Sequence, residues 1–190
     1  MYLSHYMVLL NERGGKTMLY QSVYYSPVGK ITIVSNEDHL VGLWIEGQKY
    51  FLGSIKEEMI DKETDVLKDT KEWLDKYFNH QLPQISELSL APMGSEFSQI
   101  VWQILIEIPY GEVITYGEIA KIVATKLQRK SMSSQAVGNA VGRNPISIII
   151  PCHRVVGKNG SLTGYAGGVD KKAMLLKLEG VDISKFTFPK

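Results

Sequence analysis

Cys152 is the only cysteine in this 190-residue chain, and its neighbours are typical of a reactive thiol. Pro151 precedes it, and His153 and Arg154 follow it directly. The thiolate is the nucleophilic form of cysteine, so an adjacent base and positive charge would lower its pKa and favour reaction. Glu179, near the C-terminus, is our candidate for a carboxylate that orients the imidazole. The alternative is a lone buried thiol with a purely structural role.

An apolar run, Ile146–Ile150, leads to this cysteine and predicts a buried strand. Successive side chains of a strand point to opposite faces, so adjacent Cys152 and His153 would not meet on a regular strand. A direct hydrogen bond between them requires a kink at Pro151. Otherwise a bridging water would relay the proton.

Two short helices are predicted before this run. Thr115 and Glu118 form a capping box for the first helix, and Ser133 or Ser134 can cap a second that ends at about Gly142. The second helix is rich in Ala and Gly, so its backbone could approach another surface closely. This pattern fits a helix-turn-helix and equally fits a plain αα-hairpin.

The chain as a whole is predicted to be α/β, with two domains. We divide it into a dispensable extension (1–17), a small N-terminal α/β domain (18–91) and a mostly helical C-terminal domain (92–190). The N-terminal domain is predicted to hold strands at Tyr20–Tyr25, Ile31–Ser35 and Leu40–Ile45 and a helix at about Asp65–Phe78. Further helices are predicted to be capped by Ser95 and Asp170.

Charge is divided unevenly between these domains, although the net charge is only +1. Residues 1–91 contain 9 Lys and Arg against 13 Asp and Glu, and residues 92–190 contain 12 against 7. Residues 119–169 carry seven basic side chains and no acidic one. This segregation indicates an anionic partner such as a phosphate backbone; the alternative is a solvated basic surface.

Composition excludes several classes of protein. A single cysteine cannot form an intramolecular disulfide or a zinc site with two thiolates. The sequence has no apolar stretch of membrane-spanning length, and its N-terminus does not resemble a secretory signal. We therefore expect a cytoplasmic protein, and we expect it to be a monomer without a metal or cofactor.

Four segments resemble the O6-alkylguanine-DNA alkyltransferase family, whose members are methylated-DNA–protein-cysteine methyltransferases. The segments are IPYGEVITYGEIA (108–120), AVGNAVGRNPISIIIPCHRVVGKNG (136–160), TGYAGG (163–168) and LEG (178–180). They occur in the family's order and cover most of the C-terminal half. In the N-terminal half, SPVGKITI and LVGLWIEGQ suit the family's variable first domain, which implies an RNase H-like unit with an antiparallel sheet.

This resemblance implies DNA repair by direct reversal of damage. The protein would bind duplex DNA through its minor groove, flip an O6-alkylguanine out of the stack and transfer the alkyl group to its own cysteine. Flipping is required because the alkylated O6 is inaccessible within the stack. The thioether product is stable, so each molecule would react once.

The resemblance also assigns roles to individual residues. Cys152 would be the nucleophile, His153 its base through a water, and Glu179 the carboxylate that orients His153. Tyr116 would donate toward N3 of the leaving guanine, and Asn144 would support the active-site turn. The remaining implied contacts are to the substrate base, at Val155, Tyr165 and Ala166, and to DNA, at Ser134, Gln135, Ala136, Gly138, Asn139 and Arg143.

Gln135 departs from the pattern, because many members have an arginine there that fills the space left by the flipped base. We expect Gln135 to be a weaker wedge, with the basic loop 126–130 and Arg143 supplying more of the phosphate affinity.

Two other functions remain open at this point. One is a module that binds alkylated DNA without repairing it, which an intact Cys152 argues against. The other is a cysteine hydrolase or redox protein using Cys152, His153 and Glu179. Transfer of one methyl group per molecule distinguishes the alkyltransferase from both.

Overall fold

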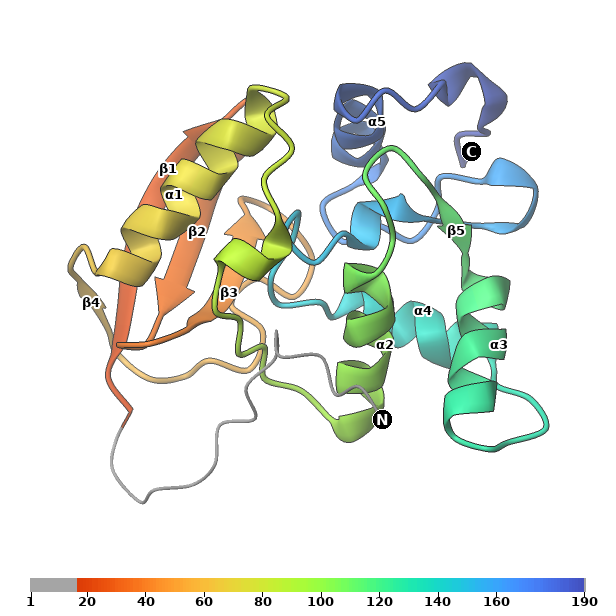
Figure 1. Ribbon diagram of the computed structural model, residues 1–190, viewed down its shortest axis with the longest axis horizontal. Coiled ribbons are helices and arrows are strands. Elements are labelled where there is room, and N and C mark those ends of the chain that lie inside the picture. The colour runs from red at the N-terminus through yellow and green to blue at the C-terminus, as the bar shows by residue number, and fades with distance from the viewer. Residues whose placement is uncertain (1–16, 190) are drawn as a thin grey trace. The chain divides into compact units, whose positions relative to one another are not determined.

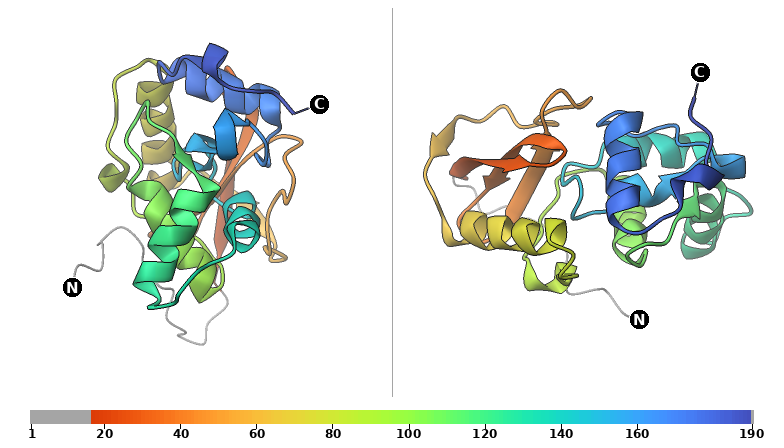
Figure 2. Two further views of the ribbon diagram at one scale, coloured as in Figure 1. Left: turned by 90° about the vertical axis from the view of Figure 1, so that its right-hand side faces the viewer. Right: turned by 90° about the horizontal axis from the view of Figure 1, so that it is seen from above.

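The computed structural model describes residues 17–189, which form two compact units (Figures 1 and 2). The first, the sheet unit, contains the described chain up to Glu46 together with Phe51–Met93 and Pro145–Ser147. The second, the helical unit, contains Gly47–Tyr50, Gly94–Asn144 and the chain from Ile148 onward. Nearly all of the predicted extension 1–17 lies outside the described residues.

The sheet unit is a four-stranded sheet with one helix on its face (Figure 1). Its strands run in the order β3-β2-β1-β4. The first three are antiparallel, as predicted, but β4 pairs with β1 in parallel, so the sheet is mixed. Three residues are too few for a strand pattern to be recognised in the sequence. The elements are β1 (Leu19–Ser26), β2 (Gly29–Ser35), β3 (Leu40–Ile45), β4 (Met59–Asp61), α1 (Asp65–Phe78) and a 3-10 turn, η1 (Ile85–Glu87).

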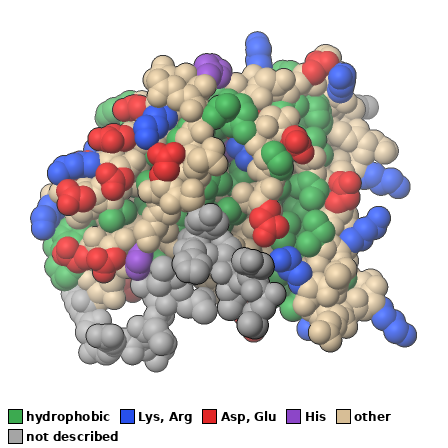
Figure 3. Space-filling model, in the orientation of Figure 1, with side chains coloured by type: hydrophobic (Ala, Val, Ile, Leu, Met, Phe, Trp, Pro, Cys, Tyr) green, Lys and Arg blue, Asp and Glu red, His purple; other side chains and the backbone are tan. Residues whose placement is uncertain are grey.

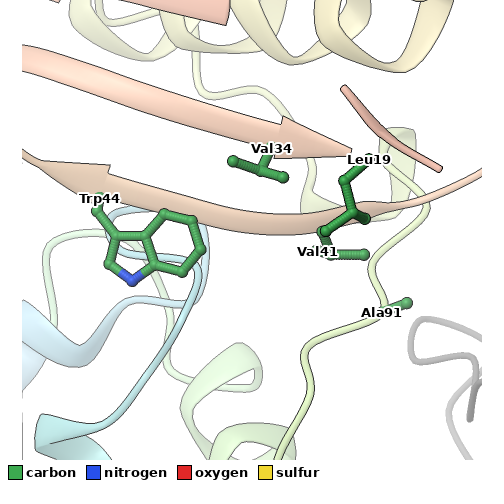
Figure 4. Packing of buried hydrophobic residues seen from close by; sticks show 5 residues of the cluster. All are labelled: Leu19, Val34, Val41, Trp44 and Ala91. Atoms are coloured by element: carbon green, nitrogen blue, oxygen red, sulfur yellow. The ribbon is translucent and has the colours of Figure 1, made fainter. Parts of the chain in front are cut away.

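Apolar side chains of the strands and of the chain leaving this unit make one of its cores (Figure 4). Trp44 on β3 is almost fully buried there, and a Cβ atom at Gly42 would lie only 1.9 Å from its ring. Glycine at position 42 is therefore what allows the indole to fold back over its own strand. The labelled cluster comprises Leu19, Val34, Val41, Trp44 and Ala91.

The helical unit has four helices and a two-stranded parallel pair. Capping by Ser95, and the capping box of Thr115 and Glu118, are both confirmed, and Ser133 caps the following helix. The helices are α2 (Glu96–Ile106), α3 (Tyr116–Lys126), α4 (Ser134–Gly142) and α5 (Val169–Leu178). The strands are β5 (Ile114–Thr115) and β6 (Val155–Val156), and the 3-10 turns are η2 (Cys152–Arg154), η3 (Lys158–Gly160) and η4 (Ile183–Lys185).

Two predictions about the C-terminal half of the chain were wrong. Residues 146–150 are buried but do not form a strand: only Ile146 makes an isolated bridge, and Ile148 has a positive φ of 71°. A continuous apolar run indicates burial without specifying backbone conformation, which explains the error. Asp170 does not cap α5; Gly168 occupies the N-cap position, and Asp170 lies in the first turn.

Figure 3 shows Asp and Glu side chains concentrated over the sheet unit and Lys and Arg side chains along the outer edge of the helical unit. This distribution agrees with the division of charge along the sequence. Within residues 17–189, no helix combines the length and the apolar character needed to cross a bilayer.

Candidate active site

Cys152 begins a 3-10 turn and is buried, with 4% of its surface exposed. Pro151 has φ −81° and ψ 63°, and the backbone N–H of Cys152 donates to the carbonyl of Ile150 at 2.8 Å. These values describe an inverse γ-turn, so the chain kinks at Pro151. Among the described residues, however, no direct hydrogen bond joins the Cys152 thiol to the His153 imidazole. The Asn144 amide donates to the same carbonyl at 2.8 Å and to Cys152 Sγ at 3.1 Å. Asn144 therefore holds the turn and contacts the thiol directly.

Glu179 contacts the two residues that follow Cys152, His153 and Arg154. Its Oε1 lies 2.7 Å from His153 Nε2, and Arg154 donates to both carboxylate oxygens at 2.8 and 2.9 Å. The Gly111 backbone N–H donates to Oε2 at 3.2 Å. The structure thus places Cys152 and His153 on η2 and Glu179 at the end of α5, in contact with His153. His153 Nδ1 is buried and has no hydrogen-bond partner among the described residues.

Burial sets the direction of the pKa shifts. It raises the pKa of Cys152 to about 11, although hydrogen bonding from Asn144 and the charge of Lys172 act in the opposite direction. Burial also lowers the pKa of His153, against the influence of Glu179. The pKa of Glu179 lies well below its ordinary value, because hydrogen bonds and positive charge from His153 and Arg154 outweigh its desolvation. The expectation of a lowered thiol pKa was therefore wrong: desolvation of the anion exceeds the stabilisation by its neighbours.

Lys172 is a site residue that the sequence reasoning missed. Its side chain is fully buried on α5, and its ammonium donates to the carbonyls of Val155 at 2.5 Å and Thr163 at 2.9 Å. Burial lowers the pKa of this amine to about 8. The signal was present in the sequence, because Lys172, Leu175, Leu176 and Glu179 share one helical face at spacings of three and four. A lysine and a glutamate on a buried apolar stripe indicate paired or hydrogen-bonded charges.

Tyr116 is the first residue of α3 and lies beside the loop that follows β6. Pairing of β5 with β6 places it there, since Thr115 pairs with Val156. Its hydroxyl donates to the Thr163 carbonyl at 3.3 Å, and burial raises its pKa. Gly164 has φ +85°, and a Cβ atom there would lie 2.3 Å from the Tyr116 hydroxyl. Glycine is thus required at 164 both by its backbone and by the tyrosine.

A surface hollow of about 770 Å³ joins Tyr116 to the predicted DNA-binding helix α4. The hydrogen bond from Trp102 Nε1 to the Ala140 carbonyl, at 2.9 Å, fastens α4 to α2. Of the predicted DNA contacts, four line the hollow: Ser134, Gln135, Gly138 and Asn139. Ala136 is half-buried and Arg143 is exposed, and neither lines it.

The predicted base-binding residues differ in their surroundings. The Val155 carbonyl already accepts from Lys172, and a carbonyl has a second lone pair for a substrate donor. Tyr165 is buried, with its ring edge-on to that of His153 at 6.5 Å and its hydroxyl without a described partner. The Ala166 carbonyl accepts from the backbone N–H of Lys49 at 2.9 Å.

These side chains form a site suited to group transfer onto sulfur. A buried thiol lies next in sequence to an imidazole–carboxylate pair. Tyr116 and the helix with small residues, α4, line a hollow whose lining does not include Cys152. Among residues 17–189, no three His, Cys, Asp or Glu side chains are grouped to hold a metal ion.

Comparison with protein families gives two matches in chain order. Residues 19–92 match the ribonuclease-like domain of 6-O-methylguanine DNA methyltransferase, and residues 96–181 match its DNA binding domain. Together the two matches span most of the chain.

Individual relatives match over nearly their full length. The methylated-DNA–protein-cysteine methyltransferase of Methanosarcina acetivorans is 42% identical over 163 residues, covering 85% of this chain and 99% of the relative. That of Haemophilus influenzae is 41% identical over 165 residues, covering 87% and 88%. A crystal structure of Mycobacterium tuberculosis OGT in complex with DNA superposes with a TM-score of 0.73 at 34% identity, covering 88% of this chain and 94% of that one.

Proposed function

The chain belongs to the 6-O-methylguanine DNA methyltransferase family, and from that premise we propose that it repairs O6-alkylguanine in duplex DNA by moving the alkyl group to Cys152. The observation that carries the assignment is the position of this thiol, the only one in the chain. Its Sγ accepts from Asn144, and it lies next in sequence to the buried pair of His153 and Glu179.

The transfer is a displacement at the alkyl carbon. A bond forms from Cys152 Sγ to that carbon while the bond from the carbon to guanine O6 breaks, with its electrons passing to the purine. His153 removes the thiol proton through a water bound at Nδ1, and Glu179 holds the ring through Nε2. Tyr116 exchanges its hydrogen bond to the Thr163 carbonyl for one to N3 of the leaving guanine, and so neutralises the charge that develops there.

Desolvation has a defined place in this reaction. In the free protein the Cys152 pKa of about 11 keeps the sulfur protonated at neutral pH. Removal of the thiol proton by His153 is therefore a necessary part of the transfer step. Lys172 and Asn144 then stabilise the developing thiolate.

DNA binding is assigned to the helix-turn-helix of α3 and α4. The small residues of α4 suit the minor groove, which is about 6 Å wide. Contacts made in this groove depend little on base sequence. A minor-groove reader can inspect any duplex and capture a guanine that flips easily because its pairing is weakened. We place this activity in a monomer in the cytoplasm, where thiols remain reduced.

The decisive experiment uses duplex DNA with one O6-methylguanine. We expect a gain of one methyl group per protein molecule, located by peptide mass on Cys152. The Cys152→Ser variant should bind the duplex and gain nothing. Tight binding by the wild-type protein without mass gain would indicate a lesion-binding module instead, and repeated turnover would indicate a hydrolase.

The binding mode needs a separate measurement. A small minor-groove ligand should compete with the protein for undamaged duplex, whereas bulky major-groove substituents on the pyrimidines should leave its affinity unchanged. The reverse pattern would assign α4 to the major groove. Sedimentation with and without DNA tests the monomer.

A further inference from the structure

Residues 47–50 directly follow β3 in the chain, yet they belong to the helical unit by their contacts. The Lys49 backbone N–H donates to the Ala166 carbonyl at 2.9 Å, in the loop that carries Tyr165. Gln48 is buried, with 5% of its surface exposed. These contacts fix the segment on the unit that holds the candidate active site.

Two cationic groups lie over the ring of Tyr50. The Arg143 guanidinium lies 4.5 Å from the centre of this ring, and the Lys49 ammonium lies 5.0 Å from the same centre. Both distances are within the range of a cation–π contact. Lys49, Tyr50 and Arg143 are all exposed to solvent. We call these three residues the Tyr50 cluster.

Two features distinguish this cluster from a self-contained surface pair. Among the described residues, no carboxylate forms an ion pair with Lys49 or Arg143. The only other lysine described over a tyrosine ring is Lys62, which lies 5.1 Å from the centre of Tyr20, and there Glu37 accepts a hydrogen bond from the tyrosine hydroxyl. The Tyr50 cluster therefore gathers positive charge without a described counter-ion.

The position of Arg143 on α4 is compatible with a phosphate of the DNA backbone as the anion. It is the C-cap of α4, eight residues after Gln135, and so lies about 12 Å farther along the helix axis. On B-DNA that distance spans three to four base-pair steps of one strand. The C-terminus of a helix carries partial negative charge, which repels phosphate. A phosphate can approach this end of α4 only if cations such as Arg143 and Lys49 offset that charge.

We propose that the Tyr50 cluster binds a backbone phosphate of the DNA, at the opposite end of α4 from Gln135. The proposal rests on the proposed function and extends the DNA-binding surface beyond the helix-turn-helix to a segment that follows β3. Tyr50 is a positioning residue, because its ring contacts both cations. Lys49 and Arg143 make the contact.

The test is the salt dependence of binding to undamaged duplex. A phosphate contact contributes about 0.9 to the slope of log K against log salt. Because Lys49 and Arg143 contact one phosphate, Lys49→Gln and Arg143→Gln should each reduce the magnitude of this slope, and the two substitutions together should reduce it by about 0.9. Lys49→Gln keeps the backbone N–H that binds Ala166, so the loop remains in place. The matched control is Lys62→Gln, which removes the same charge and the same type of ring contact and should leave the slope unchanged.

A second pair of variants tests the ring. Tyr50→Phe retains a face for the cations and should bind as the wild type does, whereas Tyr50→Ala should lose affinity at low salt by several fold. Unchanged slopes in Lys49→Gln and Arg143→Gln, equal losses in Lys62→Gln, or equal binding by Tyr50→Phe and Tyr50→Ala would each overturn the proposal. Methyl transfer by the wild-type protein is measured on the same preparation. Absence of transfer refutes the proposed function, whereas normal transfer with unchanged slopes refutes this inference alone.

Discussion

His153 Nε2 lies 2.7 Å from Glu179 Oε1, and neither side chain is exposed to solvent. The contact leaves Nδ1 as the ring atom available to take a proton. Arg154 donates to both oxygens of the same carboxylate, so the charge of Glu179 is shared between a base and a permanent cation. Glu179 therefore contributes both to the proposed reaction, through His153, and to the stability of the fold, through Arg154.

Glu179→Gln should therefore affect both properties. The amide keeps the shape of the side chain but leaves Arg154 buried without a counter-ion, which typically costs about 3–5 kcal/mol. It also removes the charge that supports protonation of His153, so the rate of methyl transfer should fall. Urea unfolding and single-turnover transfer measure the two effects. Full activity in a stably folded Glu179→Gln would contradict the role of the carboxylate.

The stability of the wild-type protein should also fall at acid pH, because protonation of Glu179 removes the same charge. The pKa of Glu179 is depressed in the folded state, so its contribution is present above the unfolded value of about 4.5 and is lost as pH falls below it. Melting temperatures from pH 7 to pH 3 should fall more steeply for the wild type than for Glu179→Gln. Parallel curves for the two proteins would show that the carboxyl is not held ionised.

The pH dependence of transfer distinguishes a base-assisted reaction from a preformed thiolate. If His153 takes the thiol proton, the wild-type rate stays level between about pH 6.5 and the Lys172 pKa of about 8. On the acid side it falls only below about 6.5, because burial lowers the pKa of His153. His153→Gln should be slow at neutral pH and rise about tenfold per pH unit toward the thiol pKa of about 11. A wild-type rate that rises in that manner would exclude His153 as the base.

Much of the helical unit could be predicted because its signals are local. Ser95, Thr115 and Glu118 cap their helices as the sequence indicated, since capping involves residues only three positions apart. The backbone of Ile146–Ile150 could not be predicted, because packing rather than local preference determines a buried irregular segment.

The site shows the same limit. Adjacency of Cys152 and His153 indicated a reactive pair, but the direction of the thiol pKa depends on desolvation, which a linear sequence does not contain. Nor does the sequence show that the ammonium of Lys172, 20 residues after Cys152, lies close enough to influence the thiol pKa. Lys172 was detectable only through the apolar face that it shares with Leu175 and Leu176.

Lys172→Met tests the contribution of that ammonium. Methionine fills a similar volume but removes a positive charge that lowers the pKa of Cys152 and a donor to two carbonyls. The thiol should titrate at a higher pH, followed by thiolate absorbance, and transfer at neutral pH should slow. Lys177→Met, on the exposed side of α5, is the matched control. An unchanged thiol titration in Lys172→Met would show that the amine is only a structural clamp.

Gln135 tests how the protein holds DNA around an extruded base. It is exposed on the first turn of α4 and lines the hollow beside Tyr116. Gln135→Arg adds a cation and a planar group large enough to occupy the space that a flipped guanine leaves. We expect higher affinity for duplex DNA and faster transfer at saturating DNA, because extrusion becomes less costly. Gln135→Lys separates the two effects, since it adds the charge without the planar bulk and should raise affinity alone. Equal transfer rates in the wild type and Gln135→Arg would show that glutamine already serves as a full wedge.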